Sequence, residues 1–166
     1  MSGLYLTAVT LHVLAALFWL GGMFFLGVVG APALRGVEPA ALRQQLFNEL
    51  GVRFRNAGWV AIATLVTTGI IVLHERGLLH WDGVFGSAAF WGTSLGRALA
   101  VKLLAVAIMI VVSAVHDFAL GPMASRLEAG TPEALAMRKK AAMLARVNAL
   151  VGLVVVLAAV RLARGG

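Results

Sequence analysis

The side chains able to do chemistry in this 166-residue sequence are few, and most of them lie within or beside long apolar runs. The chain has four histidines and no cysteine, which excludes thiol catalysis, disulfides and thiolate metal sites. It shows no nucleophile triad, phosphate-binding loop or pair of carboxylates, and none of its seven acids lies deep in an apolar run. Metal or haem chemistry would therefore depend on His, Met, Lys and carboxylate side chains, and no enzymatic reaction class is indicated.

Four apolar blocks must position these side chains. Apolar residues make up 61% of the chain and charged residues 13%, against about 45 to 50% and about 25% in soluble proteins. Each block approaches the roughly 20 residues that cross a hydrocarbon core about 30 Å thick. We predict an all-α integral membrane protein, one domain (1–166) folded as a four-helix transmembrane bundle with helices at about 4–30, 57–76, 97–120 and 132–163. No Lys or Arg precedes the first block, so we expect a mature helix rather than a signal peptide.

The net charge of +7 is unevenly distributed along the chain. Eight of the fourteen basic residues lie in the two segments 31–56 and 121–141. The positive-inside rule places both segments in the cytoplasm and both termini outside. The charge is thus explained by topology, and we expect a lipid bilayer rather than nucleic acid as the partner of this chain.

Both predicted cytoplasmic segments have prolines at similar positions relative to the predicted helix ends. Gly30-Ala31-Pro32 and Gly121-Pro122 are predicted to stop a helix, and Pro39-Ala40-Ala41-Leu42 and Pro132-Glu133-Ala134-Leu135 to start the next one. The likeness fits a duplicated helical hairpin, and it equally fits the frequent use of proline at the ends of membrane helices.

Two further segments have a distinct character. Between Pro39 and Arg55 apolar residues share one helical face, which predicts either a short cytoplasmic amphipathic helix on the inner leaflet or an amphipathic extension of the second span. The segment 77–96 has five glycines and four aromatic residues, which predicts a Gly/aromatic-rich outer loop. This loop could form a lid, although an interfacial aromatic belt explains its tryptophans equally well.

Polar and soft side chains form stripes on the predicted helices, and such stripes should face the bundle interior. Depth then selects which of them can meet. His12 lies about 10 Å below the outer surface, and His74 and Lys102 lie near that surface. The sequence therefore predicts one outward-facing constellation, which His80, Glu75 and Asp82 could close from above. The residues of the stripes are His12, Ala16, Trp19, Met23 and Gly30; Lys102, Met109, Ser113 and His116; and Ala63, Thr67 and His74.

Imidazole suits both copper and haem iron, so two ligand sets follow. A copper site would use His12, His74 and His80. A haem b site would use His12 with His74 or Lys102 as the second ligand, and Trp19 beside the ring. Met23 is about 16 Å along the helix from His12, too far to bind the same ion. Without a ligand, His12 would hydrogen-bond a hydroxyl on another span, His74 and His80 would be solvated, and Lys102 would reach towards the outer surface.

Several motifs resemble the copper resistance protein D (CopD) family. They are Arg53-Phe54-Arg55 before the second span, Thr68-Gly69 within it, the run from Thr93 to Lys102, and Pro122. The first helix also resembles the family, through His12 followed by Trp19-Leu20-Gly21-Gly22. The resemblance implies copper handling at the bacterial inner membrane, with periplasmic-side histidines presenting the ion and transport as an extension of that role.

The first helix also resembles HemJ, a haem-binding membrane family linked to haem synthesis. That family has a lysine on the third span and an Arg-x-Asn-like start to the fourth, which Lys102 and Arg146-Val147-Asn148 resemble. The sequence then differs from the family, because Ala149-Leu150 stand where the family continues with Glu and Pro. This resemblance implies haem b and electron transfer or a redox reaction. A third hypothesis is a non-catalytic subunit of a homo-oligomer or larger membrane complex, in which the polar stripes serve helix packing alone.

Overall fold

The computed structural model describes residues 2–79, 84–128 and 130–165, and nearly all of them are helical. Each long helix begins after a residue in extended conformation; at α1, α5 and α7 the hydroxyl of Ser2, Thr93 or Thr131 accepts a hydrogen bond from a first-turn N–H. The elements are α1 (Gly3–Phe25), the π-helical turn η1 (Leu26–Gly30), α2 (Ala31–Arg35), α3 (Ala40–Glu75), α4 (Ala88–Gly92), α5 (Ser94–Val115), the π-helical turn η2 (His116–Leu120), α6 (Gly121–Arg126) and α7 (Pro132–Ala163).

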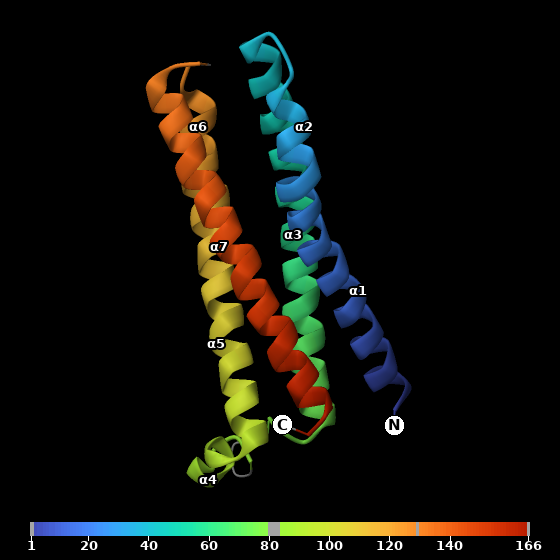
Figure 1. The fold of residues 1–166 in the computed structure, drawn as a ribbon. Helices are drawn as coiled ribbons and strands as arrows, with labels where there is room; N and C mark the ends of the chain where they lie inside the picture. The colour runs from blue at the N-terminus through green and yellow to red at the C-terminus, as the bar shows by residue number, and fades with distance from the viewer. Residues whose placement is uncertain (1, 80–83, 129, 166) are drawn as a thin grey trace.

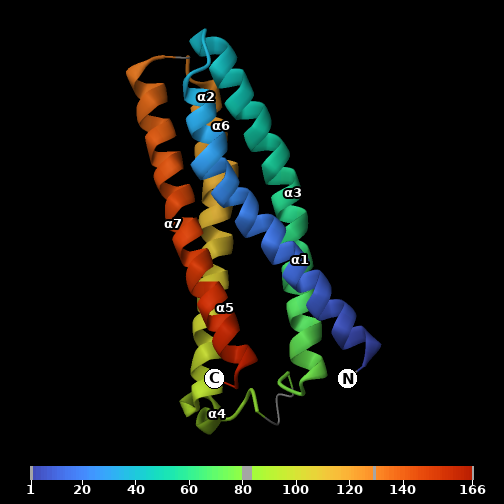
Figure 2. The same ribbon diagram turned by 45° about the vertical axis from the view of Figure 1, so that its right-hand side comes forward.

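The predicted four-helix membrane bundle is confirmed. Four continuous helical stretches are long and apolar enough to cross a membrane: Gly3–Arg35, Ala40–Glu75, Ser94–Arg126 and Pro132–Ala163. They form two hairpins, α1 with α3 and α5 with α7 (Figure 1). Both chain ends and α4 lie at one end of the bundle, the terminal end, whereas α2 and α6 lie at the opposite, basic end (Figures 1 and 2).

The predicted helix stops at Pro32 and Pro122 are wrong, because both helices continue for another turn. In a regular α-helix the proline ring would clash with the carbonyl four residues earlier. Here Ala31 and Gly121 bond the carbonyls of Leu26 and His116, five residues back, and this wider π turn removes the clash. The first and third spans therefore end at Arg35 and Arg126, not near residues 30 and 120.

The two π turns support an internal repeat. They begin at Leu26 and His116, 90 residues apart, and each is followed within two residues by a proline. The same spacing relates interior positions of α1 and α5: Ala8 and Trp19 are buried, as are Ala98 and Met109. The two hairpins thus bury equivalent faces.

The segment 40–55 does not form a separate interfacial helix. No proline interrupts α3, which runs unbroken from Ala40 to Glu75, so the alternative of an extended second span is the correct one. The apolar face of this extension covers α1 and α2, with Phe54 against Gly22 and Leu50 near Gly30.

The outer segment contributes a short helix, α4, packed on the start of α5. Trp91 stacks edge-on against Phe85 and Phe90, and its indole N–H donates to the Phe85 carbonyl at 3.0 Å. Trp81, the fourth aromatic residue of the expected lid, lies outside the described residues.

Replacing Gly22 with Ala is expected to lower the free energy of unfolding by about 1 kcal/mol, because overpacking forces neighbours to move. A Cβ on Gly22 would lie 2.3 Å from Cε2 of Phe54, while a Cβ on Gly21 meets nothing within 4 Å. Gly21→Ala is therefore the matched control, and its better helix propensity should leave stability equal or higher. Thermal unfolding of both variants in one detergent measures the difference, and equal losses would contradict this packing.

Candidate functional site

His12 on α1 is held by a hydroxyl of the neighbouring helix. Its Nδ1 lies 2.9 Å from Oγ1 of Thr68, which is buried on α3. The short contact of 2.6 Å from the Thr68 hydroxyl to the Thr64 carbonyl favours donation there, and in that arrangement the hydroxyl accepts from His12. Nδ1 therefore carries the proton, and the lone pair of Nε2 remains available to a ligand.

Gly69 lies directly beside this imidazole. A Cβ at this position would lie 3.5 Å from Cε1 of His12, which is an ordinary van der Waals distance. The ring of His12 therefore packs against the backbone of α3 at Gly69, next to the hydrogen bond with Thr68.

Lys102 belongs to the same region of the bundle. Its side chain is half-buried on α5, and its charge interacts with His12 and with Arg76. Lys102 comes from the second hairpin, whereas His12 and Arg76 belong to the first. The structure therefore brings His12 and Lys102 to one level, as expected from their depths.

The other expected ligands lie at the terminal end. His74 is exposed in the last turn of α3, where neighbouring Glu75 accepts a hydrogen bond from Ser2 and Arg76 donates to the Tyr5 hydroxyl at 2.9 Å. His80 and Asp82 lie outside the described residues. Over the ranges that the structure does describe, no three His, Asp or Glu side chains form a group able to hold a metal ion.

Trp19, expected beside a haem ring, lies in the bundle core. It is 5% exposed, and a Cβ on Gly58 would lie 3.5 Å from its indole. Ala61, Ile62 and Met109 complete the core cluster around it. Its contacts in the structure are thus packing contacts between the two hairpins.

Asn148 is a polar residue that sequence reasoning did not select as a site. It lies midway along α7 and is 4% exposed. Its Nδ2 donates to the Ser113 hydroxyl at 2.8 Å and lies 3.9 Å from the sulfur of Met23. Its buried Oδ1 has no hydrogen-bond partner among the described residues. An asparagine in the middle of an apolar run was the available signal.

His116 and Asp117 form a second polar group, of which the sequence pattern selected only His116. η2 carries the helix past both residues, so they do not lie at a helix end. Asp117 instead accepts from the Trp59 indole at 2.9 Å, and its other oxygen lies 2.8 Å from Nδ1 of His116. This contact joins α3 of one hairpin to η2 of the other.

Polar contacts thus occur at three levels along the bundle. His12, Thr68 and Lys102 lie nearest the terminal end, Met23, Ser113 and Asn148 lie in the middle, and Trp59, His116 and Asp117 lie towards the basic end. The step from His12 to Met23, or from Lys102 to Ser113, is eleven residues, or about 16 Å along a helix. The first level offers a free imidazole nitrogen, the second a thioether and an amide oxygen, and the third an imidazole and a carboxylate.

Comparison with known proteins finds a family match for the second to fourth spans. The family model for copper resistance protein D matches residues 48–162, which include Thr68, Lys102 and Asn148 but not α1. An uncharacterised protein from Aquifex aeolicus (strain VF5) is 40% identical over 62 residues, 37% of this chain and 42% of that relative's length. No solved structure matches. The family model matches more than half of the chain's length, so the chain belongs to the copper resistance protein D (CopD) family.

Proposed function

We propose that this CopD-family membrane protein binds copper near the terminal end of its bundle, with Nε2 of His12 as the principal ligand. The hydrogen bond from His12 Nδ1 to Thr68 carries the proposal, because it fixes the tautomer that leaves Nε2 free. His74 and His80 are the further ligands we propose. The name of the family supports copper as the ion.

Sparse ligands favour the reduced ion. The described residues offer no group of three His, Asp or Glu side chains, which hard divalent cations would require. Met23 and Met109, by contrast, lie in the bundle interior, and thioether sulfur selects Cu(I). We therefore propose Cu(I), and its movement through the bundle as an extension of binding.

The proposed membrane is the bacterial inner membrane, with the terminal end facing the periplasm. The basic residues of segments 31–56 and 121–141 support this orientation through the positive-inside rule. His12 and Lys102 would then lie on the periplasmic side. Proteolysis of a C-terminal tag in spheroplasts tests this, since a tag protected there and cleaved only in inverted vesicles would contradict it.

Metal analysis and an absorption spectrum on one detergent-purified sample test the proposed function. Copper supplied anaerobically with ascorbate should remain bound through gel filtration, and no Soret band should appear after haem-replete expression. A Soret band would favour haem b held by His12 with Lys102 or His74. Neither cofactor, together with stoichiometric partner proteins, would favour a packing role in a larger complex.

Thr68→Val is expected to weaken Cu(I) binding by roughly 10- to 100-fold, the usual cost of removing a partner that orients a ligating imidazole. Valine removes the hydroxyl oxygen that lies 2.9 Å from Nδ1 of His12. Competition with a chromophoric Cu(I) chelator measures the loss.

Two variants separate this effect from a loss of packing. Thr68→Ser keeps the hydroxyl and should keep most of the affinity. Thr64→Val removes a hydroxyl that donates to the Val60 carbonyl of its own helix and should behave like the wild type. Unchanged copper affinity in Thr68→Val, with the protein folded, would contradict an orienting role for this threonine.

A further inference from the structure

The middle polar level contains an unsatisfied group in an otherwise apolar core. The Asn148 side chain is 4% exposed, and its Oδ1 meets no donor in the described part of the chain. A buried amide oxygen without a partner is costly, because it has lost its hydrogen bonds to water. Such a group needs an explanation, and a bound water or ion is a usual one.

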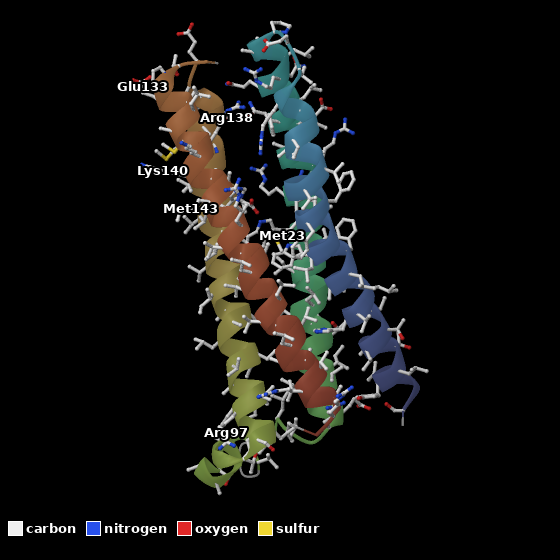
Figure 3. The ribbon with its side chains drawn as sticks, viewed as in Figure 1. Met23, Arg97, Glu133, Arg138, Lys140 and Met143 are labelled. Carbon is white, nitrogen blue, oxygen red and sulfur yellow. The ribbon has the colours of Figure 1, made fainter. Side chains whose placement is uncertain are left out.

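Soft and polar atoms surround this amide. Met23 Sδ lies 3.9 Å from Asn148 Nδ2, and the Ser113 hydroxyl lies 2.8 Å from it. The sulfur of Met109 lies close to α7 at Gly152, where a Cβ would be 3.9 Å away. Figure 3 shows Met23 on the inward side of α1, facing the second hairpin. The amide therefore lies where α1, α5 and α7 meet.

The backbone supports a special role for this level. Met23 and Ser113 are 90 residues apart, equivalent positions of the two hairpins, and each lies three residues before a π turn. π turns within α-helices are rare and are frequent at functional sites. Both turns thus adjust the helices just beyond the two side chains that contact Asn148.

We propose that Met23 Sδ and Asn148 Oδ1 form a second site for a soft monovalent cation, in the middle of the membrane. The thioether of Met109 lies one helical turn away along α5, as a neighbouring donor. All these groups are neutral, so a hard divalent cation would gain too little to leave water, whereas sulfur favours Cu(I). The identity of the ion rests on the proposed copper function; the site itself rests on the unpartnered amide.

The two sites hold different ions. His12 and Met23 are about 16 Å apart along α1, so no single ion can contact both side chains. The middle site lies between His12 and the His116–Asp117 group along the bundle, and an ion leaving His12 towards the basic end would meet it next. The site is therefore the inward step that transport would need.

Anaerobic titration with Cu(I) against a chromophoric chelator tests this site in the detergent-purified full chain. The wild type should bind two equivalents, and Met23→Leu and His12→Ala should each lose one, a different one in each case. Met143→Leu is the matched control, because Met143 is 66% exposed on the outer side of α7 and should keep both (Figure 3).

X-ray absorption on the wild type gives an independent readout should Met23→Leu fail to fold. At two equivalents the copper spectrum of the wild type should show sulfur scattering, and His12→Ala should keep it. One equivalent with only nitrogen and oxygen neighbours, abolished by His12→Ala, would overturn the middle site and leave the proposed function standing. No bound copper at all would overturn both.

Discussion

His12→Ala should abolish tight copper binding at the first site, lowering affinity by more than the roughly 100-fold that loss of an orienting partner alone can cost. The hydrogen bond from Nδ1 to Thr68 leaves the Nε2 lone pair of this imidazole available to an ion. Metal analysis after gel filtration, together with chelator competition, measures the loss. The effect should exceed that of Thr68→Val, because a ligand is removed rather than reoriented.

His116→Ala is the matched control for this substitution. His116 is also an intramembrane histidine, but it pairs with Asp117 towards the opposite end of the bundle. It should keep the copper bound at the first site. If His12 served only to hold α1 against α3, His12→Ala would lower stability and leave copper content unchanged, and the proposed function would fail.

The number and lengths of the spans could be predicted because they depend on one dominant quantity, the apolar length needed to cross a bilayer. The helix ends at Pro32 and Pro122 could not be predicted in the same way. Proline normally interrupts the hydrogen bonds of a helix, and the sequence does not show that a π turn supplies bonds one residue longer. The same limit explains the unbroken α3, since an amphipathic pattern fits both a surface helix and an extended span.

The depth of the candidate-site residues in the membrane could be predicted, but their contacts could not. Periodicity placed His12 on an inward stripe, and the hydrogen bond to a hydroxyl on another span, which was expected for His12 without a ligand, is present. That the partner is Thr68 depends on the relative register of α1 and α3, which no local pattern encodes. Asn148 and Asp117 were passed over for the same reason: their importance comes from Met23, Ser113 and Trp59, all distant in sequence.

Few polar contacts cross between the two hairpins. Gln44 donates to the Leu127 carbonyl at 3.0 Å near the basic end, Asn148 approaches Met23 in the middle, and Trp59 donates to Asp117. Lipid offers apolar helices no hydrophobic drive to associate, so packing and such hydrogen bonds must hold the hairpins together. The Trp59–Asp117 bond is the shortest of these three contacts, at 2.9 Å.

Asp117→Ala is therefore expected to destabilise the bundle by about 1 kcal/mol, because the partly buried indole donor of Trp59 would lose its acceptor. The Trp59 indole N–H would lose its partner, and His116 would lose the oxygen 2.8 Å from its Nδ1. The contact between Arg55 and the Asp117 carbonyl involves backbone and should persist. Thermal unfolding in detergent, followed by Trp fluorescence, measures the loss.

Asp117→Asn separates the hydrogen bond from the charge. Its amide oxygen can still accept from Trp59, so most of the stability should return if the indole contact holds the hairpins together. Trp59→Phe removes the same bond from the other side, and combined with Asp117→Ala it should cost little more than either change alone, because both delete one interaction. Additive losses would instead mean that Asp117 acts mainly through His116, and the hairpins would then be joined by packing around Trp19 rather than by this bond.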